Sequence, residues 1–259
     1  MICVFPNQKG GVSKTVSTLH FAAALAAKGY KALIIDCDPQ CDLSFALGIK
    51  KENDYNIVDF LENKKDFRLR QKSENLFILP GSEDFFCFNY EISALKDVLY
   101  LVRDNGSSIA DYFDFIFIDV PPARISPLKN KRFPVFTEAE LAIYAADAFL
   151  IPLLADAFSA KNADAFLGKV SSFIKHFKLN INFLGFFFGK VLLTSNSYEF
   201  YANKFRKHNS SLLLKSFIRQ DLEVEHAILK GRTIFQYKPN SRAASDYIAF
   251  CDEFLSLIK

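Results

Sequence analysis

Lys9-Gly10-Gly11-Val12-Ser13-Lys14-Thr15 decides the fold of this chain, and it follows directly on the short apolar run Ile2–Phe5. A hydrophobic strand, a glycine-bearing turn and a Lys-Thr pair that opens a helix are typical of a phosphate-binding loop. The backbone N–H groups of such a loop point at the anion, and the helix dipole adds positive potential. We expect Lys14 to reach the β- and γ-phosphates of a nucleotide and Thr15 to offer its hydroxyl to Mg²⁺.

The match to the usual pattern, G-x-x-x-x-G-K-[ST], is incomplete because Gln8 and Ser13 occupy its two glycine positions. Ser13 brings a β-carbon into the loop. Since this position starts a helix, we expect it to need no positive φ, so that a small residue is tolerated. Taken alone, the loop is a weak indication of nucleotide binding.

Two acidic segments follow strand-like runs, at the places where parallel strands would end. Asp36-Cys37-Asp38-Pro39-Gln40 follows Ala32–Ile35, and Asp119-Val120-Pro121-Pro122 follows Phe115–Ile118. With its second lysine, Lys9, the loop reads K-G-G-x-x-K-[ST]. Together these motifs resemble the deviant Walker A loop, the D-x-D-P-Q segment and the Walker B strand of the ParA/MinD family of ATPases. The resemblance covers nearly the whole chain.

This resemblance implies ATP and Mg²⁺ as cofactors and gives each motif a role. Lys9 would reach the nucleotide of a second subunit, so that ATP binding produces a homodimer. Lys14 would hold the phosphates and Asp38 would orient the attacking water, which makes these three the expected catalytic residues. The expected metal-site residues are Thr15, Asp36 and Asp119. The expected ATP-binding residues form one stretch: Lys9, Gly10, Gly11, Val12, Ser13, Lys14, Thr15 and Val16.

Two positions depart from the family pattern. Val16 stands where a second threonine is common, and Val120 replaces the threonine that often follows the Walker B aspartate. Each change removes a polar contact but no charged group. We therefore expect nucleotide binding to persist and hydrolysis to be slow without a partner.

The composition is that of an ordinary globular protein, with 50% apolar and 24% charged residues. Apolar runs alternate with helix-like stretches, which predicts one α/β P-loop NTPase domain over residues 1–259, with a mostly parallel twisted sheet of about seven or eight strands and helices on both faces. We expect strands near Ile2–Phe5, Lys31–Ile35, Leu76–Leu79, Phe113–Ile118, Ala148–Leu153, Asn182–Leu193 and Ser211–Phe217. We expect helices at Lys14–Lys28, Asn56–Glu62, Asp84–Arg103, Thr137–Ala146, Ser159–Phe177, Ser197–His208, Asp221–Lys230 and Ser241–Ile258.

The sequence gives no sign of a membrane or a metal cluster. No apolar run approaches the roughly 20 residues that span a bilayer, and the chain opens into a strand, so we expect a cytoplasmic protein. The five cysteines are scattered, which favours free thiols over a zinc or iron–sulfur site. The closing helix Asp246–Ile258 is rich in acids, whereas MinD-type relatives need a basic amphipathic one. This favours the ParA side of the family and no membrane partner.

Cations gather in the last quarter of the chain, although the net charge is only +3. Non-specific DNA affinity needs only phosphate contacts of this kind. The segments Phe217–Arg219 and Lys238–Arg242 resemble those that carry DNA-contacting arginines in the family, so Arg219 and Arg242 are the expected DNA-binding residues. A second basic segment, 123–135, is either a solvated loop or a contact with the second subunit, DNA or a partner.

The resemblance implies a ParA-like ATPase that partitions a chromosome or a plasmid. Its ATP-bound dimer would bind DNA non-specifically on the nucleoid, and a ParB-like partner would stimulate hydrolysis and release. One alternative is a MinD-like or other cargo-positioning switch that does not act through DNA. Another is a metabolic P-loop enzyme such as a carboxylate-activating ligase. Lys9 argues against the enzyme, since chemistry within one subunit has less use for a lysine that acts in a second.

Overall fold

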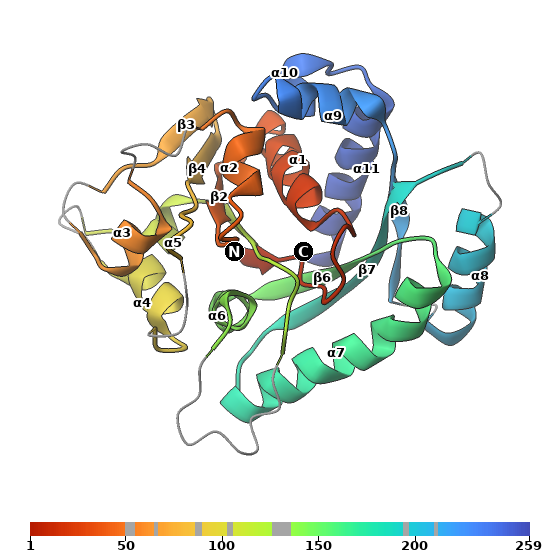
Figure 1. The fold of residues 1–259 in the computed structure, drawn as a ribbon, viewed down its shortest axis with the longest axis horizontal. Coiled ribbons are helices and arrows are strands. Elements are labelled where there is room, and N and C mark those ends of the chain that lie inside the picture. Colours follow the sequence, from red (N-terminus) through yellow and green to blue (C-terminus); the bar gives the residue numbers. More distant parts are fainter. Residues whose placement is uncertain are drawn as a thin grey trace.

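A single mixed sheet forms the centre of the computed structural model, which describes residues 1–49, 55–64, 67–85, 90–102, 106–125, 136–193, 197–209 and 212–259 (Figure 1). Its eight strands lie in the order β3-β4-β2-β5-β1-β6-β7-β8, and all neighbours are parallel except β3 and β4. The strands are β1 (Ile2–Val4), β2 (Ala32–Asp36), β3 (Arg70–Ser73), β4 (Leu76–Leu79), β5 (Phe115–Asp119), β6 (Ala148–Leu153), β7 (Asn182–Val191) and β8 (Leu213–Arg219).

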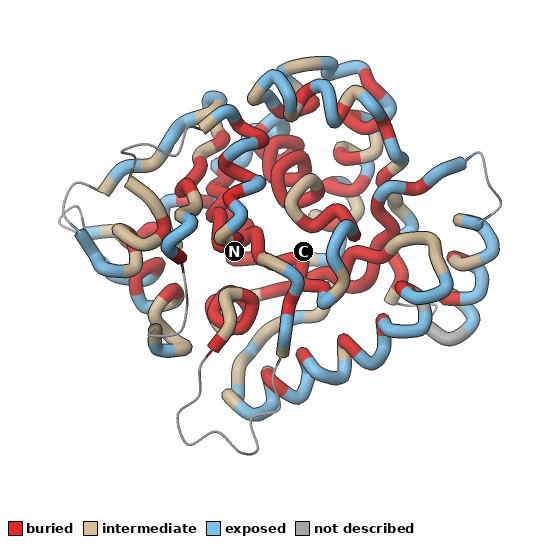
Figure 2. The backbone as a smooth tube through the Cα atoms, in the orientation of Figure 1, coloured by how far each residue is buried: buried red, intermediate tan, exposed pale blue. Residues whose placement is uncertain are grey.

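Helices cover both faces of this sheet, as the sequence predicted. One hydrophobic cluster joins one face to a first helical layer, namely α1 (Lys14–Ala27), α2 (Asp42–Ala46), α9 (Leu222–Leu229), α10 (Ile234–Tyr237) and α11 (Arg242–Leu257). A second cluster joins the other face to α3 (Ile57–Leu61), α4 (Ala94–Tyr100), α5 (Ile109–Tyr112), α6 (Glu138–Ala145), α7 (Ala157–Phe177) and α8 (Ser197–Asn209). The central strands β2 and β5 are buried at every residue, which explains their continuous hydrophobicity (Figure 2).

Phenylalanine rings fill the layer between the sheet and the helices α1 and α11. Measured between ring centroids, Phe21 of α1 lies 4.6 Å from Phe250 of α11, and Phe187 of β7 lies 4.7 Å from Phe250. Phe5 is 5.5 Å from Phe187. These phenylalanine residues therefore fill the core, and burial of each ring contributes roughly 1.5–3 kcal/mol to stability.

Carboxylates of α11 cap the exposed edge of the sheet at β8. Glu253 accepts hydrogen bonds from the backbone N–H groups of Lys215 (2.8 Å) and Ser216 (2.7 Å). Asp246 accepts one from the N–H group of Arg219 at 2.9 Å. An unprotected edge strand would offer these groups to another chain, so the acids of α11 protect the sheet edge.

The structure differs from the expected elements in a few places. It adds the strand β3 and the short helices α2, α5 and α10. Of the expected helix Asp84–Arg103, only α4 is helical among the described residues, and 86–89 and 103–105 lie outside them. The helix α7 begins two residues earlier than expected, because Asp156 caps it by accepting from Ser159 N–H.

Candidate nucleotide-binding site

The three sequence motifs meet at the carboxyl ends of β1, β2 and β5. Asp36, at the end of β2, lies directly beside Asp119, at the end of β5, in the parallel register. The loop between β1 and α1 runs past them, and Lys14 is the first residue of α1. Parallel strands bring their carboxyl ends to one edge of the sheet, so residues far apart in the chain form one site.

The loop backbone corrects our expectation for Ser13. This residue has φ 67° and ψ 23°, so it is left-handed and does not begin the helix with a negative φ. The cost is about 1–2 kcal/mol for a residue with a β-carbon. The Ser13 hydroxyl donates to Val12 O at 2.5 Å and lies against Gly189 of β7. A β-carbon at Gly189 would come 2.1 Å from this hydroxyl, so the loop and β7 fit together only because position 189 is glycine.

Lys14 is buried and faces two of the acids. Burial lowers the pKa of Lys14, whereas the negative charges of Asp119 and Asp38 raise it. Its Nζ atom donates to Lys9 O at 3.4 Å, a long and weak hydrogen bond. Because this hydrogen bond is weak, the ammonium group of Lys14 remains available to bind a phosphate.

Asp119 is buried and, among the described residues, neither of its carboxylate oxygens has a hydrogen-bond partner. Its burial, followed by the charge of Asp36, raises its pKa well above the usual range, and the nearby Thr15 hydroxyl opposes that rise. Orphaned carboxylate oxygens beside a hydroxyl suit a hard divalent cation, which prefers oxygen ligands. The residues present therefore fit Mg²⁺.

Hydrogen bonds from Ser44 and from the backbone of Asp38 hold the Asp36 carboxylate in place. Its Oδ2 atom accepts from Ser44 Oγ (2.6 Å) and Ser44 N–H (2.9 Å), and its Oδ1 atom accepts from Asp38 N–H (3.2 Å). Burial nevertheless raises the pKa of Asp36 to about 6. Sequence reasoning missed Ser44 and also Gly81, whose N–H donates to Ser44 Oγ at 2.9 Å. A β-carbon on Gly81 would lie 2.9 Å from the Asp36 carboxyl carbon, so this approach also requires glycine.

Asp38 lies within reach of the same group of charges. It is 9% exposed, and its Oδ1 atom accepts from Gln40 N–H at 3.0 Å, whereas its Oδ2 atom has no donor among the described residues. Burial raises the pKa of Asp38, and the charge of Lys14 opposes the rise. The next turn bends at Cys41, another left-handed residue with φ 56°.

Lys9 is held within its own chain by Asp156. The ammonium group of Lys9 lies 2.7 Å from Asp156 Oδ2, and both side chains are about one-third exposed (38% and 34%). Although partial burial acts the other way, the hydrogen bonds from Lys9 and Ser159 lower the pKa of Asp156. Sequence reasoning missed Asp156. Its only local signal was its suitability as a helix cap.

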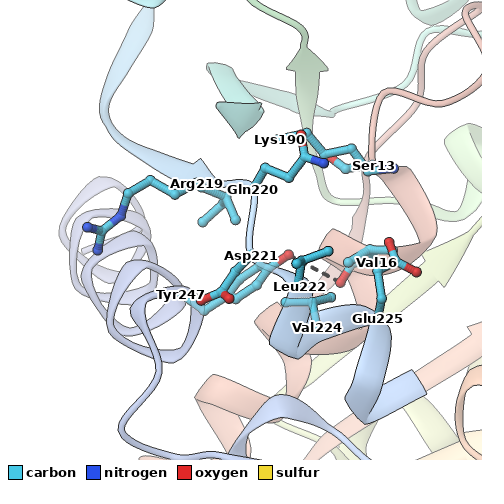
Figure 3. A pocket seen from close by; sticks show the side chains of 11 residues that line it. Ser13, Val16, Lys190, Arg219, Gln220, Asp221, Leu222, Val224, Glu225 and Tyr247 are labelled. Carbon is cyan, nitrogen blue, oxygen red and sulfur yellow. Dashed lines mark hydrogen bonds between the residues drawn. The ribbon is translucent and has the colours of Figure 1, made fainter. Parts of the chain in front are cut away.

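A small cavity of about 50 Å³ opens beside the phosphate-binding loop (Figure 3). Ser13 and Val16 line one side, and Tyr247 of α11 donates to Val16 O at 3.4 Å. Lys190 lies beside Ser13, and Arg219, the last residue of β8, and Gln220 after it also line the cavity (Figure 3). Arg219 therefore lines the same cavity as Ser13 and Val16 of the nucleotide motif. The basic segment 123–135 lies outside the described residues beyond position 125.

These features define a P-loop nucleotide-binding protein. A family model described as "AAA domain" matches residues 1–183, and the chain belongs to that family as a P-loop ATPase of the ParA/MinD type. It is 28% identical over 256 residues to the virulence plasmid ParA family protein pGP5-D of Chlamydia psittaci, covering 96% of this chain and 92% of that protein.

A second relative is similar in sequence, and a solved structure is similar in fold. The chain is 24% identical to the chromosome-partitioning ATPase Soj of Thermus thermophilus, with 98% and 94% of the two chains covered. The crystal structure of a putative plasmid partition protein of Borrelia burgdorferi bound to AMPPNP superposes with a TM-score of 0.74 at 19% identity, covering 98% of each chain. The predicted family and α/β fold are thereby confirmed.

Proposed function

We propose that this protein is a partition ATPase that uses ATP and Mg²⁺ to switch between a monomer and a DNA-bound homodimer. The observation that carries the proposal is the convergence of Lys14 and Thr15 with the three buried acids Asp36, Asp38 and Asp119. Three carboxylates crowded around one lysine are electrostatically costly unless a cation joins them. A Mg²⁺–nucleotide complex supplies both that cation and the anion for Lys14.

In this proposal, each residue of the site has a distinct role. The loop amides and Lys14 would bind the phosphates, and Thr15 and Asp119 would hold Mg²⁺, with Asp36 beside Asp119. When bound, the cation would neutralise negative charge on the phosphates. Asp38 would orient the attacking water with Oδ2, the carboxylate oxygen that does not accept from Gln40 N–H. The small cavity beside Val16 is the place for the edge of the adenine base.

Slow hydrolysis by the isolated protein is part of this proposal. Catalysis of phosphoryl transfer needs a cation near the terminal phosphate to neutralise developing charge. Lys9 supplies it only from a second subunit, and in one chain its ammonium group is held by Asp156. The ATP-bound dimer would bind DNA non-specifically on the nucleoid, and a ParB-like partner would stimulate hydrolysis.

A switch that positions other cargo without DNA is the second candidate. A MinD-like membrane cycle finds less support, because the closing helix α11 carries the acids Asp246, Asp252 and Glu253, whereas a helix that lies on an anionic membrane needs a basic face. Among the described residues, no helix is both long enough and apolar enough to cross a membrane.

Lys9→Ala tests the proposal. The variant should bind ATP with wild-type affinity in calorimetry but remain monomeric in light scattering, because only the contact with the second subunit is lost. Lys14→Ala should lose ATP affinity, since backbone amides do not replace a full charge. An ATP-dependent dimer of Lys9→Ala that forms as readily as that of wild type would overturn the switch.

A further inference from the structure

The cations expected to contact DNA near the C-terminus already have acidic partners. Arg219 pairs with Asp246 and Arg242 with Asp221, and the nearby Lys238 pairs with Glu223. Arg219 is the most tightly held, with Nη2 2.6 Å from Asp246 Oδ1 and Nε 2.9 Å from Oδ2. A DNA phosphate at Arg219 would have to displace a bidentate carboxylate, so it would gain little there.

The helix α8 presents a different arrangement, and its orientation is fixed by aromatic packing. Tyr198 lies 4.4 Å from Phe217 of β8, and Phe205 lies 4.9 Å from Phe186 of β7, both measured between ring centroids. Ala202 between them is fully buried. These positions are spaced i, i+4 and i+7, so one face of the helix is anchored to the sheet.

The opposite face of α8 carries Phe200, Lys204 and Lys207, again spaced i, i+4 and i+7. Phe200 is 61% exposed and both lysines are exposed. In the part of the chain that the structure describes, no carboxylate pairs with either lysine. The acid on this helix, Glu199, lies about 100° around the axis from Phe200. This exposed face is therefore positively charged.

Lys215, on the neighbouring strand β8, adds a third positive charge to this face. Side chains alternate along a strand, so Lys215 is on the same side of β8 as Leu213 and Phe217, which pack with the cluster beneath α8. It is exposed, and Glu253 engages only its backbone N–H group. Figure 1 shows α8 beside β8 at the margin of the molecule.

We propose that Lys204, Lys207 and Lys215, the α8 surface, make the phosphate contacts with duplex DNA. This inference rests on the proposed function and replaces Arg219 and Arg242 as its main DNA-contacting residues. Lysines without a protein counter-ion release condensed counter-ions from DNA without losing an existing ion pair. Phe200, one turn before Lys204, can rest on a deoxyribose while the lysines reach the phosphates. The contact reads no base and is therefore independent of sequence.

The test compares two charge-matched double variants with ATP present, by gel shift on unrelated duplexes over a range of salt concentrations. Lys204→Gln with Lys207→Gln removes two charges from the α8 surface. Lys175→Gln with Lys178→Gln removes two exposed charges from the far end of α7. The first should reduce the slope of log K against log salt by about 1.8 per protomer, and the second should leave it unchanged.

The outcomes separate this inference from the proposed function. Light scattering should first show that both double variants still dimerise with ATP. If wild type binds DNA and the α8 variant retains its slope, while Arg219→Ala with Arg242→Ala loses it, the α8 surface is the wrong one. If the α8 variant loses binding to phosphatidylglycerol vesicles and not to DNA, the inference also fails. Absence of DNA binding by wild type with ATP would overturn the DNA branch of the proposed function itself.

Discussion

In the proposed switch, Lys9 would link nucleotide binding to association, and Asp156 is the carboxylate that holds it. Its ion pair with Asp156 is about one-third exposed on each side, so water screens it and its contribution is about 0.2–1 kcal/mol. Such an ion pair restrains Lys9, but a more highly charged partner can displace Asp156 at little cost. A triphosphate on a second subunit is such a partner. In the proposed switch, the Lys9–Asp156 contact would therefore set a small threshold for dimerisation.

Asp156→Asn should lower this threshold. Asparagine keeps the cap on α7, so the helix is preserved while the charge that holds Lys9 is lost. Half-maximal dimerisation should then occur at an ATP concentration up to about fivefold lower, which corresponds to the upper estimate for the ion pair. Light scattering at increasing ATP measures it. An unchanged or higher ATP requirement would show that the ion pair does not restrain Lys9.

Gly189→Ala should distort the phosphate-binding loop, although Gly189 lies in β7 and not in the loop. The added β-carbon would lie 2.1 Å from Ser13 Oγ and 3.4 Å from Ser13 Cβ, so the hydroxyl must move. We expect a loss of about 1–3 kcal/mol in unfolding free energy and a weaker affinity for ATP. Ser13→Gly in the same chain removes the obstructing hydroxyl and suits the positive φ, so it should restore both. Persistent loss in the double variant would argue against this contact.

At the scale of elements, His20 joins three helices. It belongs to α1, accepts a hydrogen bond from Ile234 N–H of α10 at 3.2 Å and lies 5.4 Å from the ring of Tyr247 of α11. Its Nε2 atom has no partner among the described residues. Burial lowers the pKa of His20 to about 3. The protein therefore needs this imidazole to be neutral.

Acid should weaken the junction at His20. The unfolded chain binds a proton near pH 6.5, whereas the folded protein does so only near pH 3. Stability from this group is therefore complete above pH 6.5 and declines as the pH falls, by up to about 2 kcal/mol at pH 5. His20→Gln keeps an acceptor for Ile234 N–H but does not titrate, so its stability deficit relative to wild type should shrink between pH 7.5 and 5. Denaturant unfolding would show it, and a deficit independent of pH would contradict it. Asp36 shifts stability in the opposite sense but is present in both proteins.

Glu253→Ala should destabilise the edge of the sheet. It leaves the N–H groups of Lys215 and Ser216 without their carboxylate, at a cost of about 1–3 kcal/mol. The uncovered edge should also promote association at high protein concentration, without ATP. Asp252→Ala on the same helix is the matched control, because it breaks only the exposed pair with Lys28 and should cost less than about 1 kcal/mol. Equal losses in the two variants would refute the capping role of Glu253.

At the scale of the whole molecule, the parts that could be predicted were those governed by local pattern. Strands buried on both faces are continuous apolar runs, and acids that follow them must meet where parallel strands end. The strand β3 was missed because Arg70–Ser73 is a polar edge segment with no apolar run. The left-handed Ser13, the Ser44 contact with Asp36 and the Lys9–Asp156 pair were also missed. These depend on how distant segments approach one another.

Asp38→Ala should trap the whole protein in its associated state. Asp38 is proposed to orient the water, whereas the phosphates are held by Lys14 and the second subunit's nucleotide is reached by Lys9. Removal of Asp38 also lowers the negative charge beside Lys14, so ATP binding should be at least as strong as in wild type. Dimers formed with ATP should then persist in light scattering after excess nucleotide is removed, while wild-type dimers decay as hydrolysis proceeds. Lys9→Ala in the same chain should abolish the trapped dimer, because it removes the contact that holds the two subunits. A variant whose dimers decay at the wild-type rate would show that another group orients the water.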